Sequence, residues 1–344
     1  MPPKKVSVVI LNWNGKDFLS RFLPGIIEYS GTAEIVVADN ASSDGSAEFI
    51  RTNFPSVRIV QNSENGGFAK GYNDALQKIE SDYYVLLNSD VEVTPGWLEP
   101  LIQLADSDPS IAACQPKILD YKNKARFEYA GAAGGFIDKY GYPFCRGRIF
   151  DSFEEDEGQY NDTREVFWAT GACLFVRADA YHRQQGLDVD FFAHMEEIDL
   201  CWRLKNEGFK IMYCADSTVF HVGGGTLSKS NPRKTYLNFR NSLILLCKNH
   251  APGFFWIKLL FRMILDCVAG LKFLLAGDVK HCFAVVHAHG SFYKTFRRTL
   301  KKRKQQRKSI QNYATTPLYH KCIVFDYFLW GKGKFSELEK NLFQ

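Results

Sequence analysis

Residues 5–90 alternate short apolar runs with segments of helical periodicity, and this alternation restricts the possible folds more than any other feature. The apolar runs predict strands at residues 6–11, 34–38, 57–60 and 83–87. Apolar residues recur at helical spacing from Phe18 to Ile27, and further helices are predicted at residues 46–53 and 68–79. Strands that alternate with helices form a mostly parallel, doubly wound sheet, so the sequence predicts an α/β fold.

The alternation becomes less regular beyond residue 90. A helix is predicted at residues 95–106 with Pro95 in its first turn, whereas residues 120–165 are rich in Gly, Tyr and charge and predict irregular structure with short strands. The remaining predictions are strands at residues 111–116, 172–176, 209–214 and 217–221 and a helix at residues 196–206. Since 46% of the 344 residues are apolar, a large core can form. We predict a main domain over residues 1–250 and an extension over residues 251–344.

Short polar residues follow three of the predicted strands at the point where each strand ends. Asp39 and Asp44 follow the second strand, Gly66 and Gly67 follow the third, and Asn88-Ser89-Asp90 follows the fourth. Ligands bind at the carboxyl ends of strands in open α/β sheets, and a carboxylate there suits a divalent cation that carries a phosphate substrate. The same residue types are also common in turns and helix caps. The two glycines do not form a GxGxxG motif, which disfavours a dinucleotide-binding fold.

Seven motifs, in order along the chain, resemble those of a family 2 inverting glycosyltransferase with the GT-A fold, and the rhamnosyltransferase-type members are the most similar. The motifs are VSVVILNWN, DNASSDGS, ENGGFAKGYN, LLNSDVEV, TGACLFVRADAY, FFAHMEEIDLCWRLKNEGFKI and HVGGGT. Together they cover about residues 5–250. The resemblance implies a cytosolic enzyme of cell-surface polysaccharide synthesis. Such an enzyme transfers a sugar from a dTDP- or UDP-sugar, dTDP-rhamnose among the candidates, to an acceptor hydroxyl, with Mg²⁺ or Mn²⁺ on the diphosphate.

The resemblance also implies roles for individual residues. Asp39 matches the carboxylate that holds the nucleobase, Asp90 matches a metal ligand, and Asn88 is expected to contact ribose or a metal-bound water. His221 matches a further metal ligand, although a cap or a structural histidine is the alternative. The other residues expected to contact the nucleotide sugar are Asn12, Asp44, Asn65, Gly67, Lys70, Asn73, Ser89, Gly171 and Arg240. Residues 223–225 are glycines that would let the following loop close over the diphosphate.

Gly171 lies in a run of small residues, Thr170-Gly171-Ala172, before an apolar strand. Glycine admits close approach, so a donor sugar could lie against this run. Close packing between a strand and a helix explains the same composition. Both interpretations are open from the sequence.

An inverting transferase needs a general base beside the attacking hydroxyl, and three carboxylates are available for this role. On a helix that starts near Met195, Glu196 and Asp199 share a face, while Glu197 points about 100° away. The family motif usually reads Glu-Asp with Asp as the base, and its position falls on Glu197, which departs from the pattern. We therefore expect Glu197 to be the base, with Glu196 as the alternate. Asp199 and Arg203 are expected to form a structural i,i+4 pair.

The extension differs from the main domain in charge and periodicity. Residues 251–344 carry 17 Lys/Arg and 5 Asp/Glu, a net +12, which leaves 5 − 12 = −7 for residues 1–250. Residues 254–276 are apolar, but Lys258, Arg262 and Asp266 recur along one face, so an amphipathic helix in a membrane interface is favoured over a spanning helix. Residues 297–308 hold eight basic side chains in twelve, which suits an anionic membrane surface; nucleic acid is disfavoured because aromatics are not interleaved. A lipid-linked acceptor would fit this location.

Cysteine usage and the N-terminus indicate a cytoplasmic protein, and residues 254–308 would place it on the inner face of the cell membrane. The nine cysteines show no CxxC pair and several lie within apolar patterns, which predicts reduced, buried thiols. The apolar run at residues 6–11 is too short for the core of a signal peptide.

Two other functions fit parts of the pattern. A sugar nucleotidyltransferase has similar nucleotide chemistry, but would be expected to carry a Gly-rich, Arg-bearing loop where this chain has Asn12-Trp13-Asn14-Gly15-Lys16. A non-catalytic, membrane-associated scaffold with a degenerate nucleotide site is the second. The presence of Asp39, Asp90, Glu197 and His221 together argues against the scaffold.

Overall fold

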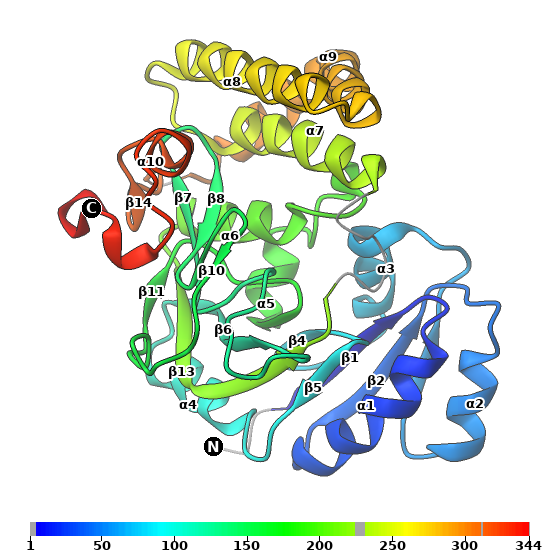
Figure 1. The fold of residues 1–344 in the computed structure, drawn as a ribbon. Helices are drawn as coiled ribbons and strands as arrows, with labels where there is room; N and C mark the ends of the chain where they lie inside the picture. Colours follow the sequence, from blue (N-terminus) through cyan, green and yellow to red (C-terminus); the bar gives the residue numbers. More distant parts are fainter. Residues whose placement is uncertain (1–4, 224–230, 311, 344) are drawn as a thin grey trace.

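A central sheet organises the protein (Figure 1). The computed structural model describes residues 5–223, 231–310 and 312–343. One half of the sheet is parallel and has the order β4-β1-β2-β3. Its strands are β1 (Val6–Asn12), β2 (Glu34–Asp39), β3 (Arg58–Gln61) and β4 (Tyr83–Asn88). The four strands predicted from the first apolar runs are therefore confirmed, with shifts of one residue at some ends.

The other half of the sheet is mixed. It contains β5 (Val91–Val93), β6 (Ile111–Asp120), β11 (Arg164–Val166), β12 (Cys173–Arg177) and β13 (Lys210–His221). Strand β12 lies between β4 and β6 and is antiparallel to both. The sequence predicted a mostly parallel sheet and gave no sign that this strand is antiparallel. The strands predicted at 209–214 and 217–221 are one strand, β13, whose register shifts between Cys214 and Thr218. This irregularity is the reason that the pattern looked like two strands.

Helices cover both faces of the sheet, and each face has its own hydrophobic core. The helices of the main domain are α1 (Lys16–Tyr29), α2 (Ser46–Asn53), α3 (Gly67–Leu76), α4 (Glu99–Ser107), α5 (Ala178–Arg183) and α6 (Glu196–Asn206). Helix α1 buries Leu19, Phe22 and Ile26 because these residues recur at helical spacing. The prediction that α4 begins near Pro95 was wrong: Thr94 to Trp97 form a turn, and the helix begins at Glu99.

Residues 120–165 form short strands, as predicted. Four of these strands and β14, which comes from the C-terminal segment, build a second sheet with the order β10-β9-β8-β7-β14. Its strands are β7 (Gly135–Asp138), β8 (Pro143–Cys145), β9 (Arg148–Ile149), β10 (Ser152–Phe153) and β14 (Leu318–Tyr319). Because β14 pairs with β7, the C-terminal segment returns to the main domain.

A layer of helices lies on top of this body in Figure 1. It consists of α7 (Pro232–Asn249), α8 (Phe255–Leu275) and α9 (Val279–Gln306), and the chain then ends with β14, α10 (Ile323–Phe328) and two short 3₁₀ turns. The helical C-terminal extension is confirmed. No helix within the described residues combines the length and the low charge needed to cross a bilayer.

Candidate active site

The polar ends of three neighbouring strands meet at one edge of the parallel half-sheet. Asn12 of β1 is in register with Asp39 of β2, and Leu11 is in register with Asn88 of β4. Asn12 Nδ2 donates to Asp39 Oδ1 at 3.2 Å. The structure therefore brings together three of the predicted site residues, because parallel strands end at the same edge of the sheet.

Asp39 is buried, and its carboxylate is held by three protein donors. Oδ1 accepts from Asn12, while Oδ2 accepts from Gln61 Nε2 at 2.6 Å and from the Ser42 backbone N–H at 3.1 Å. A carboxylate has about four lone-pair positions, so one remains for a ligand donor. This fixed orientation suits recognition of a base N–H. Gln61, at the end of β3, was not predicted as a site residue.

The turn after β4 places Asp90 against the end of β13. Asp90 Oδ1 lies 3.1 Å from His221 Nε2, and Asn88 Nδ2 lies 3.5 Å from the same nitrogen. On the other side of the imidazole ring, Glu128 Oε2 lies 3.2 Å from His221 Nδ1. All three of Asp90, His221 and Glu128 are buried. Glu128 lies in the irregular region and was not singled out from the sequence.

His221 lies between two carboxylates, and the charges affect one another's pKa values. Burial opposes a charged imidazole, but the carboxylates of Glu128 and Asp90 outweigh it and raise the pKa of His221 to about 10. Burial alone would raise the pKa of Asp90; the neighbouring His221 and its hydrogen bond lower it instead. The Nε2 proton of a charged His221 would have to leave before that nitrogen could bind a cation, so a bound cation would replace the proton as the positive charge beside Asp90.

This arrangement fits a divalent cation. Asp90 Oδ1 and His221 Nε2 are close enough to ligate one ion, and Glu128 is placed to accept the Nδ1 proton and so fix the tautomer, as second-shell carboxylates do. Among the described residues, no three His, Cys, Asp or Glu side chains form a complete ligand set. A cation held here would have two protein ligands, and its remaining positions would be open to water or a substrate phosphate.

The candidate base lies at the start of α6. Glu197 is half-buried and its Oε2 has no hydrogen-bond partner within the described residues. Burial raises its pKa to about 7, against the backbone N–H groups of Ile198 and Gly171, which lower it. Glu196 is buried, and its pKa is raised well above the usual range by burial and by Glu197. A general base works best with a pKa near the working pH, which favours Glu197 over Glu196.

The turn before α6 has an unusual backbone. Phe192, His194 and Met195 have φ of +64°, +69° and +75°, in the left-handed region that non-glycine residues rarely occupy. Such residues cluster at functional sites, where the surrounding structure holds them. Here they turn the chain so that Glu196 and Glu197 begin the helix.

The glycines of the predicted site pack against this turn. Gly67 has a φ of +76°, and a Cβ atom there would lie 2.7 Å from the Phe192 ring and from its carbonyl oxygen. The Phe68 N–H donates to that carbonyl at 2.9 Å. A Cβ on Gly171 would lie 3.1 Å from the Phe68 ring and 3.7 Å from Glu197 Cβ. For both glycines the close neighbour in the structure is protein, and the candidate base Glu197 lies directly beside Gly171.

Four further residues predicted to contact the nucleotide have protein partners. Asp44 accepts from the Lys16 and Ser46 backbone N–H groups and so holds the starts of α1 and α2. Asn65 accepts from Asn40 and from the Gly67 N–H. The amide of Asn73 exchanges hydrogen bonds with Leu187 and accepts from the Tyr181 hydroxyl, and Lys70 pairs with Glu64 and Asp74. These contacts shape the loops, and the nucleotide contacts remain predictions.

Arg240 also has protein partners. Its Nε donates to Asn241 Oδ1, and its terminal nitrogen donates to the carbonyl oxygens of Asp190 and Phe191. Arg240 therefore lies against the turn that precedes α6.

Two other predicted site features lie close to glycines. Ser89 lies next to Gly15, where a Cβ would be 2.6 Å from Asn12 Oδ1 and 3.3 Å from Ser89 Oγ. The predicted loop at residues 223–225 lies outside the described residues except for Gly223, whose absent Cβ leaves room for Glu128.

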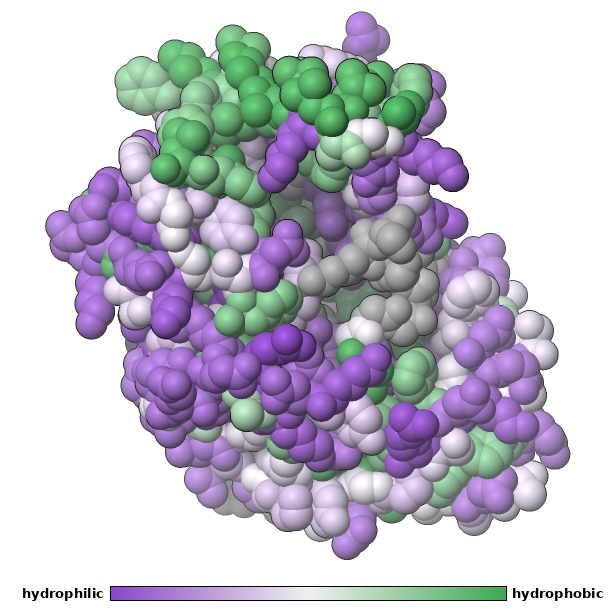
Figure 2. All heavy atoms as spheres, viewed as in Figure 1, coloured by the Kyte–Doolittle hydropathy of each residue, from purple (hydrophilic) through white to green (hydrophobic). Residues whose placement is uncertain are grey.

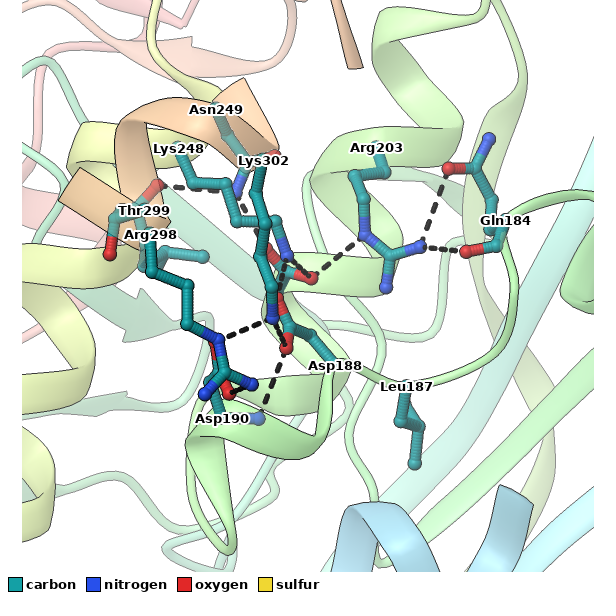
Figure 3. A network of polar contacts seen from close by, with 12 residues as sticks. Gln184, Leu187, Asp188, Asp190, Arg203, Lys248, Asn249, Arg298, Thr299 and Lys302 are labelled. Carbon is teal, nitrogen blue, oxygen red and sulfur yellow. Dashed lines mark hydrogen bonds and ion pairs between the residues drawn. The ribbon is translucent and has the colours of Figure 1, made fainter. Parts of the chain in front are cut away.

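A polar network holds α6 against α7 and α9 (Figure 3). Asp199 Oδ2 accepts from Arg203 Nε at 2.8 Å and from Lys248 Nζ at 2.7 Å, and Oδ1 accepts from Asn249. The predicted Asp199–Arg203 pair is confirmed. In the same network, Lys302 of α9 binds both Asp188 and Asp190 at 2.5 Å.

The chain is similar to several known glycosyltransferases. An N-acetylglucosaminyl-diphospho-decaprenol L-rhamnosyltransferase of Mycobacterium tuberculosis is 25% identical over 260 residues, which covers 71% of this chain and 84% of the relative. The solved mannosyltransferase PcManGT of Pyrobaculum calidifontis, in complex with GDP-Man and Mn²⁺, is 15% identical with a TM-score of 0.52, and the match covers 89% of this chain and 86% of that one.

A second solved structure, GalNAc-T7 with UDP, GalNAc and Mn²⁺, is 17% identical with a TM-score of 0.53. The match covers 71% of this chain, which spans about half (48%) of the GalNAc-T7 chain. These likenesses support the predicted GT-A fold. The model of the family described as glycosyl transferase family 2 matches residues 7–183, more than half of the chain, and the chain therefore belongs to glycosyl transferase family 2.

Proposed function

We propose that the protein is an inverting, metal-dependent glycosyltransferase that moves a sugar from a nucleotide diphosphate to a hydroxyl of a glycan or lipid-linked acceptor. One observation carries the proposal most: Glu197, with a pKa raised to about 7, lies beside Gly171, and the next residue, Ala172, accepts from the Asn88 N–H at the end of β4, two residues before Asp90. The base and the cation ligands are the two parts that this reaction needs.

In the proposed reaction, Glu197 accepts the proton of the acceptor hydroxyl as that oxygen attacks the anomeric carbon. The bond from the anomeric carbon to the phosphate oxygen breaks, and the nucleoside diphosphate leaves. Asp90 and His221 would hold Mg²⁺ or Mn²⁺, which would offset negative charge on the diphosphate. An imidazole ligand favours Mn²⁺ over Mg²⁺, which prefers oxygen ligands.

The donor is proposed to be a dTDP- or UDP-sugar. Asp39 is preset to receive a base N–H, and Asn12, beside it, has a buried Oδ1 with no partner among the described residues. The mycobacterial relative transfers L-rhamnose to a diphospho-decaprenol acceptor by its name, so dTDP-rhamnose and a lipid-linked acceptor are the first candidates to test.

Thermal unfolding with dTDP or UDP, with and without MnCl₂, tests the donor site. We expect the melting temperature to rise with nucleotide and metal together and the rise to be lost in Asp90→Ala. Asp216→Ala, an exposed acid on β13, is the matched control and should keep the rise. No rise with either nucleotide would overturn the donor-site assignment. A screen of nucleotide sugars for slow, metal-dependent hydrolysis then identifies the sugar.

We also propose that the helical layer docks on the inner face of the cell membrane. Helix α8 buries Arg262 and Asp266 as an ion pair against α7, and Arg262 donates to Ser242. The opposite side of α8 is exposed and apolar. We use the name apolar surface for the exposed apolar residues of α8 and its ends, of the first part of α9, and of the end of α10. They are Phe254, Trp256, Ile257, Leu260, Ile264, Val268, Leu271, Leu274, Leu275, Val279, Phe283, Val286, Phe328, Leu329 and Trp330. Much of it is green over α8 at the top of Figure 2.

Charge on α9 supports a lipid partner. The exposed positions 279, 283, 286 and 293 are apolar or aromatic, and the same helical stripe continues with the exposed basic residues Arg297, Lys301 and Lys304. An apolar stripe that continues into a basic one suits acyl chains beside anionic head groups. Three of the eight basic side chains predicted to face lipid do not: Arg298 and Lys302 pair with acids of the body, and Arg303 is buried.

Vesicle flotation tests this docking. The protein should float with vesicles of phosphatidylcholine and phosphatidylglycerol, float less with phosphatidylcholine alone, and stop floating when Leu260, Ile264 and Leu271 are changed to Gln. Equal flotation of the triple variant would overturn the assignment. So would a wild-type protein that forms dimers through this surface and does not float.

A further inference from the structure

The left-handed turn before the candidate base is held by one buried side chain of α7. Asn241 is fully buried, and its Nδ2 lies 3.0 Å from the carbonyl oxygen of Phe191, 2.9 Å from that of Ala193 and 2.7 Å from that of His194. Two N–H groups are thus shared among three carbonyls of the turn. A hydrophobic side chain at this position would remove this donor from all three carbonyls, and only that of Phe191 has a second side-chain donor, Arg240.

The neighbouring Arg240 fixes the direction of that amide. Its Nε donates to Asn241 Oδ1 at 2.9 Å, so the amide nitrogen faces the turn. A terminal nitrogen of Arg240 also donates to the carbonyls of Asp190 at 2.8 Å and Phe191 at 3.0 Å. The two side chains together bind carbonyls of residues 190, 191, 193 and 194.

The start of the turn is anchored separately by charge. Asp188 pairs with Lys248 and Lys302, both at 2.5 Å, and Asp190 pairs with Lys302 and Arg298 (Figure 3). These ion pairs hold the chain before the turn to α7 and α9. They do not reach residues 193 and 194, so the final approach to Glu197 depends on Asn241.

The same turn also contacts the glycine-rich loop of the donor site. The Phe192 carbonyl accepts from the Phe68 N–H, and Gly67 packs on the Phe192 ring. The turn therefore lies between the loop predicted to contact nucleotide and the residue predicted to take the proton. A shift of the turn changes the distance between donor and base without removing either.

We infer that Asn241 is a positioning residue for sugar transfer: it holds the left-handed turn that sets where Glu197 lies relative to the donor, and Arg240 orients its amide. This inference rests on the proposed role of Glu197 as the base. It also gives Arg240 a role behind the turn in place of a direct contact with the diphosphate.

The test compares Asn241→Ala and Asn241→Asp with Asn249→Ala. Asn249 is also a buried asparagine of α7, but its Nδ2 binds Asp199 and Leu245 and not the turn. Misplacing a reacting group by about 1 Å costs on the order of 100-fold in rate. We expect kcat to fall by about that factor in both Asn241 variants, with the KM for donor and the affinity for nucleotide within about threefold of wild type. Asn249→Ala should lower the melting temperature and leave kcat within about twofold.

The double variant Glu197→Gln/Asn241→Ala separates positioning from stability. If Asn241 acts through Glu197, the double variant is no slower than Glu197→Gln alone, because residues that act as a unit are not additive. Independent, multiplying losses would overturn the inference, as would an unchanged kcat in both Asn241 variants. If the Asn241 variants do not fold, Arg240→Lys provides the comparison: a lower kcat at unchanged nucleotide affinity supports positioning, and weaker nucleotide binding overturns it.

Failure of the base assignment has a different result. If Glu197→Gln alone retains transfer, the proposed base is wrong whatever the Asn241 variants do. If Glu197→Gln is inactive while the Asn241 variants are fully active, only the positioning inference fails.

Discussion

Asp199 is the residue whose removal should destabilise the protein most clearly, because its carboxylate connects α6 to α7 in the interior. Its side chain is fully buried, and it accepts from Arg203 Nε at 2.8 Å, Lys248 Nζ at 2.7 Å and Asn249 Nδ2 at 2.8 Å. Asp199→Ala removes a carboxylate that pairs with two buried cations, Arg203 and Lys248. Breaking a buried ion pair by removing one partner costs about 3–5 kcal/mol.

The structure places the expected cost of Asp199→Ala at the lower end of this range. Lys248 keeps its pair with Asp188, and Arg203 keeps the carbonyl oxygens of Gln184 and Gly186. We therefore expect the free energy of unfolding to fall by about 3 kcal/mol. Urea denaturation followed by far-UV circular dichroism measures this change.

Asp179 provides the matched control for Asp199. It also forms an i,i+4 pair with an arginine, Arg183, but the two side chains are 72% and 56% exposed and lie 3.7 Å apart. Exposed pairs of this kind contribute about 0.2–1 kcal/mol, so Asp179→Ala should change the free energy of unfolding by less than about 1 kcal/mol. Equal losses in the two variants would refute the claim that the buried network stabilises α6.

Three further predictions follow from the site. Because the pKa of Glu197 is raised to about 7 and the base must be deprotonated, transfer should fall about tenfold per pH unit below that value and level off above pH 8; a flat profile from pH 5 to 8 would contradict this role. Gly67→Ala should lower the free energy of unfolding by about 1–3 kcal/mol, since φ is +76° and Phe192 fills the space, and an unchanged value would show that the loop can move. Gly15→Ala should weaken nucleotide binding measured by calorimetry, because the new methyl group meets Asn12 Oδ1; unchanged affinity would exclude Asn12 from the donor site.

The sequence predicted best what depends on local periodicity. The strands β1, β2 and β4 and the helices α2 and α6 follow from apolar spacing, and the polar residues at the strand ends meet because parallel strands end together. The start of α4 was misplaced because a proline is compatible with both a turn and a first helical turn.

What the sequence did not show depends on contacts between distant segments. Glu128 reaches His221 from a region with no periodic pattern, and only the fold brings them within 3.2 Å. The three carbonyl partners of Asn241 lie 47, 48 and 50 residues earlier in the chain, and no local pattern marks them as partners. Likewise, the basic run of α9 predicts charge but not direction, and Lys302 turns inward to Asp188 and Asp190.

The central claim is that Glu197 takes the acceptor proton beside a donor held by Asp39 and Asp90. Glu197→Gln keeps the size of the side chain and removes its basicity. Calorimetry with nucleotide and MnCl₂ measures the nucleotide affinity of this variant. A transfer assay on the donor identified by the hydrolysis screen measures its rate of sugar transfer. We predict nucleotide affinity within about twofold of wild type and a loss of transfer of at least about 100-fold. Transfer within tenfold of wild type at unchanged affinity would contradict the account.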